Sequence, residues 1–316
     1  MTVTDLSGPV LAHLRRPRVD GSVRIAVVAD PHVAPGCGTW KVTHRSVDRF
    51  ERAVAEAHCA DAAILAGDLT GDGRRESFET VEKVLAGLTL PWAAIPGNHD
   101  VPKHFDSHKG LPAERFADRY APGLPFAMEV GPVTVLGVDT ATARDGSLRH
   151  TWGGRVGAES LAWLREVLPS IGTPIVVLHH NVAALPENPG GKWSNFQLED
   201  AADVRAALAA NDAPLVVSAH QHVPAVVDHG TTREVFCPAT CSFPQAMLSL
   251  EIDATGTTVR LVPLADPEEV REAYHHAATG KPLGVGILGM VERRLVHLPL
   301  VDETGTGCGG GDLNPR

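Results

Sequence analysis

Runs of apolar residues that end in polar side chains recur along the first two thirds of the chain. The run at residues 23–29 shows little alternation, which is typical of a strand buried on both faces. Further runs of this kind stand at residues 62–66, 91–95, 133–138, 174–178 and 214–218. Apolar residues at helical spacing predict helices between them, at about residues 44–59, 75–88, 159–168 and 200–210. This alternation predicts an α/β fold whose site lies at the carboxyl ends of the strands.

The remaining segments carry other patterns. Four short apolar runs separated by turn residues predict an antiparallel meander at residues 223–228, 233–238, 247–253 and 257–264. Residues 1–20 are expected to form an irregular arm, and residues 101–125 a loop-rich insertion. Further helices are predicted near residues 113–120 and 267–278, and an apolar stretch follows at about residues 283–300.

These patterns predict one main domain at residues 20–265 and a C-terminal extension at residues 266–316. No Pro- or Ser-rich linker divides the main domain, and no internal repeat is visible. The Gly-rich tail at residues 305–316 is expected to be disordered.

Composition limits the classes of function. Of the 316 residues, 43% are hydrophobic and 21% are charged, which is ordinary for a globular protein. The formal net charge of −10 argues against long nucleic acids and anionic membranes as partners. No apolar run reaches the length of a membrane span, and the first 20 residues lack the apolar core of a signal peptide. The five cysteines are odd in number and widely spaced, so we expect reduced thiols in a cytoplasmic protein.

Residues with metal-ligand chemistry stand at the ends of five predicted strands. They are Asp30 and His32, Asp68, Asn98 and His99, His179 and His180, and His220 and His222. Oxygen and imidazole ligands without a thiolate suit Mn, Fe or Zn. An Asp-x-His or His-x-His pair on extended backbone is expected to point both side chains to one face. Asp68 stands alone at its strand end, which makes it the natural bridge between two metal ions about 3.5–4 Å apart.

Each of these motifs is common by chance when it stands alone, whereas all five in this order are not. Other catalytic arrangements lack support, because the sequence has no GxSxG elbow, no GxxxxGKS/T phosphate loop and no cysteine beside the ligand set. A metal pair makes an activated serine or cysteine unnecessary, since bound metal lowers the pKa of water from 15.7 to about 7. No organic cofactor is therefore expected.

The sequence resembles the calcineurin-like metallophosphoesterases from about residue 23 to residue 225. The resemblance rests on five motifs, which are Asp30-Pro31-His32, Gly67-Asp68, Gly97-Asn98-His99-Asp100, His179 and Ala219-His220-Gln221-His222. The stretch Gly67-Asp68-Leu69-Thr70 and the helix lengths also resemble the cyclic-nucleotide phosphodiesterase-like (class III) branch. The resemblance implies two mixed β-sheets packed as a sandwich and flanked by helices, in four layers.

The resemblance also implies a role for each site residue. One metal ion would be held by Asp30, His32, Asp68 and His222, and the other by Asp68, Asn98, His179 and His220. A hydroxide bridging the two ions would attack phosphorus in line. His99 would stabilise the developing charge or protonate the leaving oxygen, and Asp100 would orient His99.

Two points stay open within the resemblance. Either His179 or His180 could be the ligand, and the family's pattern favours His179. Ala219 stands where the family usually has glycine, which adds a methyl group at a tight place.

The sequence thus predicts a phosphoesterase with two divalent metal ions, Mn, Fe or Zn. We expect a small phosphorylated substrate such as a cyclic nucleotide, with phosphodiesters favoured over monoesters. The alternatives are a phosphomonoesterase and a catalytically inactive scaffold that binds proteins. Substrate contacts are expected in residues 101–125 and 181–197, where the candidates are Lys103, His104, Lys192, Trp193 and Asn195. The oligomeric state stays open.

Overall fold

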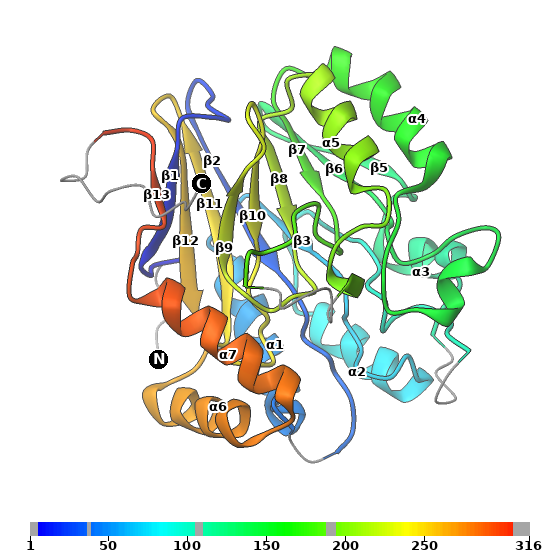
Figure 1. The fold of residues 1–316 in the computed structure, drawn as a ribbon, viewed down its shortest axis with the longest axis vertical. Helices are drawn as coiled ribbons and strands as arrows, with labels where there is room; N and C mark the ends of the chain where they lie inside the picture. Colours follow the sequence, from blue (N-terminus) through cyan, green and yellow to red (C-terminus); the bar gives the residue numbers. More distant parts are fainter. Residues whose placement is uncertain (1–5, 37–38, 105–109, 188–193, 306–316) are drawn as a thin grey trace.

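The computed structural model describes residues 6–36, 39–104, 110–187 and 194–305. Two mixed β-sheets pack face to face, and helices cover the outer face of each sheet (Figure 1). The predicted α/β sandwich in four layers is therefore confirmed. The predicted disorder of the Gly-rich tail falls on residues 306–316, which lie outside the described residues.

The first sheet has seven strands, in the order β13 (Val301–Asp302), β1 (Val10–Leu14), β12 (Gly256–Pro263), β11 (Ala246–Asp253), β2 (Ser22–Val28), β3 (Ala62–Leu65) and β4 (Trp92–Ala94). Its strands β2, β3 and β4 run parallel to one another, whereas β11 runs antiparallel to β2. Because parallel strands end at the same edge of a sheet, the polar residues that follow these three strands meet there.

The second sheet has six strands, in the order β5 (Phe126–Val130), β6 (Val133–Gly137), β7 (Pro174–Val177), β8 (Leu215–Ser218), β10 (Arg233–Phe236) and β9 (Ala225–Asp228). Strands β6, β7, β8 and β10 run parallel. The loops after β7 and β8 carry the predicted histidine ligands of the second half of the chain.

The main core fills the space between the sheets. Ile25 and Val27 of β2 face into it together with Ile175 and Val177 of β7. The alternate residues of β2, Ala26 and Val28, pack under helices on the other side of the sheet. The predicted burial of this strand on both faces is therefore confirmed from Ile25 onward, and it explains the near-continuous apolar run.

Each outer face has its own helices. Helices α1 (Ser46–Ala57) and α2 (Arg75–Leu85) cover the first sheet and bury Phe50 and Phe78. Helices α4 (Gly157–Val167) and α5 (Ala201–Ala210) cover the second sheet through Leu164 and Val204. Helix α3 (Ala113–Tyr120) lies in the insertion, where it was predicted. The other four agree with the predicted ranges to within a few residues, because each carries one apolar stripe at helical spacing.

Two sequence predictions about strands were wrong. Residues 1–20 do not form an irregular arm throughout, since β1 pairs antiparallel with β12 and parallel with β13. The predicted meander is divided between the sheets: β9 and β10 join the second sheet, while β11 and β12 join the first. The burial of β11 on both faces over Ala246–Leu250 makes it a central strand, so its neighbours come from distant parts of the chain. Strand β5 had no predicted counterpart.

The C-terminal residues form a pair of helices, α6 (Pro267–Thr279) and α7 (Pro282–Leu295), which lie together below the sheets in Figure 1. Helix α7 packs on Trp40, which precedes the short helix η1 (Thr43–Arg45). The contact is close, because a Cβ added to Gly284 of α7 would lie 2.6 Å from Trp40 Cβ. The division into residues 20–265 and 266–316 stays a prediction.

Among the described residues, no helix combines the length and the apolar character needed to cross a bilayer. Cys59, Cys237 and Cys241 are free thiols, whereas Cys37 and Cys308 lie outside the described residues. A cytoplasmic setting stays a prediction.

Glu269 joins α6 to α1. Its carboxylate pairs with the fully buried Arg49 and, at 2.8 Å, with Arg52, and it accepts the backbone N–H of Asp266 in a capping box. Burial alone would raise the pKa of Glu269, but these donors lower it from 4.5 to about 2. A lowered carboxyl pKa stabilises the folded state above pH 4.5, and this stability is lost as the pH falls toward 2.

We expect Glu269→Gln to lower the free energy of unfolding at pH 7 by about 3 kcal/mol, because Arg49 would keep its buried charge without a carboxylate. Urea unfolding measures this loss, which should shrink between pH 4.5 and pH 2. Glu268→Gln, on the same turn but exposed, is the matched control. Equal losses in the two variants would contradict the role given to Glu269.

Candidate metal centre

The residues predicted to bind metal lie together at the carboxyl ends of the strands. Loops after β2, β3, β4, β7 and β8 supply them, and all seven side chains are at most 8% exposed: Asp30, His32, Asp68, Asn98, His179, His220 and His222. Backbone hydrogen bonds join the loops, since the N–H groups of Asp30 and His32 donate to the carbonyls of Gly67 and Asp68 at 3.1 and 3.0 Å. These hydrogen bonds join the loop after β2 to the loop after β3.

Five of the seven residues have a left-handed backbone, including both i, i+2 pairs, for which extended backbone was predicted. Asp30 and His32 have φ values of 51° and 46°, Asp68 has 52°, and His220 and His222 each have 61°. Residues with a Cβ pay about 1–2 kcal/mol for this conformation. The prediction that the i, i+2 pairs sit on extended backbone was therefore wrong. The pairs converge because the chain turns sharply after each strand, and such strain is characteristic of functional sites.

Glycines allow the loops to approach closely. A Cβ added to Gly97 would lie 2.1 Å from Asp68 Oδ1, and one added to Gly67 would lie 2.6 Å from His179 Nδ1. Any larger residue at either position would force a ligand to move.

Asp30 and Asp68 each use one carboxylate oxygen to accept a backbone N–H and turn the other oxygen inward. Asp30 Oδ2 accepts the His220 N–H at 3.2 Å, and Asp68 Oδ1 accepts the His99 N–H at 2.8 Å. Asp68 Oδ2 lies 3.4 Å from His32 Nε2 and 3.5 Å from His179 Nε2. Asp30 Oδ1 is buried without a hydrogen-bond partner and lies 3.3 Å from His222 Nε2.

Hydrogen bonds fix the orientation of three of the histidine rings. His179 Nδ1 donates to the Ala66 carbonyl at 2.8 Å, and His222 Nδ1 forms a hydrogen bond with Ser242 Oγ at 2.8 Å. Both rings therefore turn Nε2 toward the carboxylates. His220 Nε2 donates to the Asn195 carbonyl at 3.1 Å, which leaves the Nδ1 lone pair of a neutral ring available.

The geometry favours His179 over His180 as the ligand. His179 Nε2 lies 3.2 Å from Asn98 Oδ1, within the centre. Both nitrogens of His180 are occupied, one by Thr140 Oγ1 at 2.8 Å and the other by the Trp152 carbonyl at 3.0 Å. Burial lowers the pKa of His180 to about 3, so its ring is neutral.

The charges of the buried groups at the centre favour binding of a cation. Burial alone would raise the pKa of Asp30 and Asp68, but neighbouring histidines hold both well below their usual range. Burial alone would lower the pKa of His179, yet the Asp68 carboxylate raises it to about 9. A proton on His179 thus occupies a place where a metal ion would supply positive charge. Together with the unpartnered Asp30 oxygen, this donor set fits metal ions bound by oxygen and imidazole.

His99 and Asp100 occupy different positions. His99 is half-buried and its Nδ1 donates to the Gly71 carbonyl at 2.8 Å, while Nε2 lies 3.5 Å from Lys41 Nζ. Asp100 is fully buried and accepts the N–H groups of Leu69, Thr70 and Gly97 at 2.8–3.1 Å. Asp100 therefore ties the loop after β3 to the loop after β4. Its orientation of His99 stays a prediction.

Three side chains at the centre were not predicted. Lys41 Nζ lies 3.0 Å from His32 Nε2 and 3.5 Å from His99 Nε2. Trp152 stacks on His99 with ring centroids 4.7 Å apart, and Trp40 lies 5.0 Å from the His222 ring. For Trp40 and Lys41, the one signal in the sequence is their position in the loop that follows the Asp30 motif. Trp152 has no such signal.

The expectation that no cysteine lies beside the ligands was wrong. Cys241 Sγ and one nitrogen each of His32 and His222 lie within 4.8 Å of one another. Cys241 follows β10 and reaches the centre through the loop that also carries Ser242. It was not predicted because it stands well after the His220 motif along the chain. Burial raises the pKa of the Cys241 thiol well above its usual range, which keeps the thiol protonated.

The candidate substrate contacts have four different outcomes. Lys103 is buried and donates to the Leu148 carbonyl at 2.8 Å, which makes it a support for the loop rather than a solvated contact. His104 is exposed and lies against His150, with ring centroids 4.5 Å apart. Asn195 lies at the centre through its contact with His220. Lys192 and Trp193 lie outside the described residues.

The methyl group of Ala219 is accommodated. Ala219 is fully buried in the main core, and its backbone is not among the left-handed residues of the described chain. The extra methyl group therefore does not force an unusual backbone conformation at Ala219.

The chain is similar to several known proteins. A probable cyclic nucleotide phosphodiesterase from Synechococcus sp. is 26% identical over 78% of this chain and 92% of its own length. A probable glycerophosphodiester phosphodiesterase from Arcobacter nitrofigilis is 25% identical over 38% of this chain and 41% of its own. The structure of a putative 5'-nucleotidase from Staphylococcus aureus is similar in fold, with a TM-score of 0.52 and 15% identity over 86% of this chain. The chain spans 58% of that longer protein.

The sequence model of the calcineurin-like phosphoesterase family matches residues 23–224 of this chain. These residues include every predicted ligand and the loop with Trp40 and Lys41. Because the match extends over more than half of the 316 residues, the protein belongs to the calcineurin-like phosphoesterase family.

Proposed function

We propose that the protein is a phosphodiesterase that depends on two divalent metal ions, Mn, Fe or Zn. The position of Asp68 carries this proposal, because Oδ2 lies 3.4 Å from His32 Nε2 and 3.5 Å from His179 Nε2. One carboxylate oxygen thus faces ligand nitrogens from two different loops. A clamp of two metal ions needs such a shared carboxylate, and a single ion does not.

The other ligands divide around Asp68. Asp30, His32 and His222 stand together, with His32 Nε2 and His222 Nε2 3.3 Å apart. Asn98, His179 and His220 form the second set, in which the rings of His179 and His220 are 5.0 Å apart. Each set, with Asp68, would hold one ion. When bound, the ions polarise the phosphoryl group and lower the pKa of the water that attacks phosphorus.

Lys41 and His99 face the place where the phosphate would lie. The Gly71 carbonyl accepts a hydrogen bond from His99 Nδ1–H, so Nε2 of the neutral ring accepts from Lys41. Desolvation, followed by the Lys41 ammonium, lowers the pKa of His99 well below its usual range. A phosphate oxygen between the two groups would accept from Lys41 and would restore the pKa of His99. The protonated ring can then donate to the leaving oxygen.

Charge supports a diester over a monoester. A phosphodiester carries one negative charge, whereas a monoester carries about 1.5–2 at pH 7. Of the two lysines described near the centre, Lys103 is already engaged with the Leu148 carbonyl, which leaves Lys41. The names of the two relatives, both probable phosphodiesterases, support the same preference. A small diester such as a cyclic nucleotide fits the acidic chain better than a long nucleic acid does.

A scaffold without metal is the weaker alternative, since every predicted ligand is present and buried at one place. Burial of two carboxylates would serve no purpose in such a scaffold. The free thiols of Cys59, Cys237 and Cys241 support a cytoplasmic protein, which remains part of this proposal.

We expect Asp68→Asn to reduce turnover of an aryl phosphodiester by more than about 100-fold, since even outer partners of metal ligands cost 10–100-fold. Elemental analysis should show fewer than two metal ions per chain in the variant. Asp118→Asn, on the exposed face of α3, should keep both activity and metal. Undiminished turnover by Asp68→Asn would exclude the dinuclear mechanism.

Substrate preference is tested separately. We expect the metal-loaded protein to hydrolyse cyclic nucleotides and aryl phosphodiesters with higher kcat/KM than the matching monoesters, because Lys41 balances a single charge. The assay should be repeated with Mn, Fe, Zn and Mg. Higher kcat/KM for monoesters would reject the phosphodiesterase proposal and would favour the phosphomonoesterase alternative.

Lys41→Gln should lower kcat/KM for a phosphodiester by about 10- to 100-fold, the value of a hydrogen bond of about 1.5–3 kcal/mol to a charged group. The metal content should not change, because Lys41 is not a ligand. Lys83→Gln, on the exposed face of α2, provides the control. A variant with normal kcat/KM would show that Lys41 does not contact the substrate.

A further inference from the structure

A second cluster of metal-binding side chains lies outside the centre described above. It joins His44 of η1 to Glu272 and His276 of α6, and one donor atom from each residue lies within 4.8 Å of the others. Glu272 and His276 stand one turn apart on α6, so their side chains leave the same face of the helix. Helix α6 lies at the lower edge of the molecule in Figure 1.

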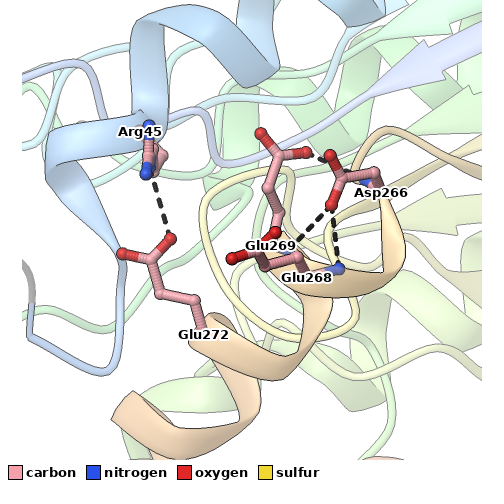
Figure 2. Close-up of a pocket in the computed structure, with 5 residues that line it drawn as sticks. All are labelled: Arg45, Asp266, Glu268, Glu269 and Glu272. Atoms are coloured by element: carbon pink, nitrogen blue, oxygen red, sulfur yellow. Dashed lines mark hydrogen bonds and ion pairs between the residues drawn. The ribbon is translucent and has the colours of Figure 1, made fainter.

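The three side chains are already oriented toward one another. His44 Nε2 lies 2.7 Å from Glu272 Oε1, and the rings of His44 and His276 are 5.7 Å apart. Arg45 holds the other carboxylate oxygen, with Nε 3.3 Å from Oε2, as the dashed line between Arg45 and Glu272 in Figure 2 indicates. Glu272 thus has a fixed orientation, with Oε1 turned to the imidazoles.

The donor set selects among metal ions. Two imidazoles and one carboxylate suit Zn²⁺, which binds nitrogen and oxygen at about 2.0–2.2 Å in tetrahedral geometry, whereas Ca²⁺ and Mg²⁺ prefer oxygen alone. Tetrahedral ligands at these distances are about 3.4 Å apart. His44 Nε2 and Glu272 Oε1 would therefore open from 2.7 Å, and the donor of His276 lies within 4.8 Å of both. The side chains of His44 and Glu272 are 32% and 29% exposed, so an ion can enter and water can complete its coordination.

We propose that His44, Glu272 and His276 bind a Zn²⁺ ion that connects α6 to the segment before α1. Binding replaces the hydrogen bond between His44 and Glu272 with two bonds to the metal, and the imidazoles bind in their neutral form. The nearby Arg45 charge makes this site weaker than the buried centre. The ion would therefore occupy it after the two ions of the centre.

The position of the site gives it a structural effect on the catalytic loop. His44 follows Lys41 by three residues, and α7 contacts Trp40 at Gly284. A metal at His44 would fix the segment of residues 40–45 at its second end. The Zn²⁺ site thus stabilises the position of Lys41 without contacting the substrate.

The test measures metal directly and does not require turnover. Protein with a Mn²⁺-loaded centre is incubated with Zn²⁺, desalted and analysed for total metal per chain. We expect about three ions in the wild type and in His275→Ala, the neighbouring histidine outside the cluster, and about two in His276→Ala and Glu272→Gln. Added Zn²⁺ should raise the Tm of the wild type and of His275→Ala but not that of His276→Ala or Glu272→Gln, because an ion that binds the folded state stabilises it.

Equal metal content in the wild type and His276→Ala would overturn the Zn²⁺ site, as would equal loss in His275→Ala and His276→Ala. Circular dichroism of each variant confirms that the fold is intact. Because the count is independent of hydrolysis, failure of the phosphodiesterase proposal and failure of this site give different results.

Discussion

Two buried carboxylates, Asp30 and Asp68, set the constraint on which the site depends. Removing a charge from water is unfavourable unless paired groups replace the lost solvation. Each carboxylate receives one backbone N–H and faces histidine nitrogens with its other oxygen. This pairing requires the chain to turn sharply after each strand, and the left-handed φ values at the ligand residues follow from it. The strain is tolerated because hydrogen bonds between the loops hold each turn in place.

The sheets supply the rigid support for these loops. Parallel strands β2, β3 and β4 of one sheet and β7 and β8 of the other end at a common edge. The apolar residues between the sheets fix the distance between the two sets of strand ends. Ligands that are up to 192 positions apart, from Asp30 to His222, therefore meet without any contact between their own side chains having to drive the fold.

The sequence predicts the position of a residue well where that position depends only on the strand that precedes it. The convergence of the predicted ligands could be foreseen because each stands within a few residues of the end of an apolar run, as Asp68 does after Ala62–Leu65. The backbone at Asp30 could not be predicted, because its left-handed φ depends on a hydrogen bond to Gly67 from another strand. Lys41 and Cys241 were missed for a similar reason, since both reach the centre through loops whose course is set by packing elsewhere. Strand β1 was missed because its hydrogen bonds come from β12 and β13, near the other end of the chain.

The loop with Trp40 and Lys41 brings an aromatic ring and an ammonium group to the predicted ligands. The loop lies between two supports, since Trp40 contacts His222 on one side and α7 on the other. A lysine on a free loop would gain little by contacting phosphate, because ordering its long side chain costs up to about 2 kcal/mol. Packing of Trp40 against α7 places that cost on folding and not on substrate binding. If Lys41 contacts the substrate as proposed, the C-terminal helices support the substrate side of the centre although they carry none of its predicted ligands.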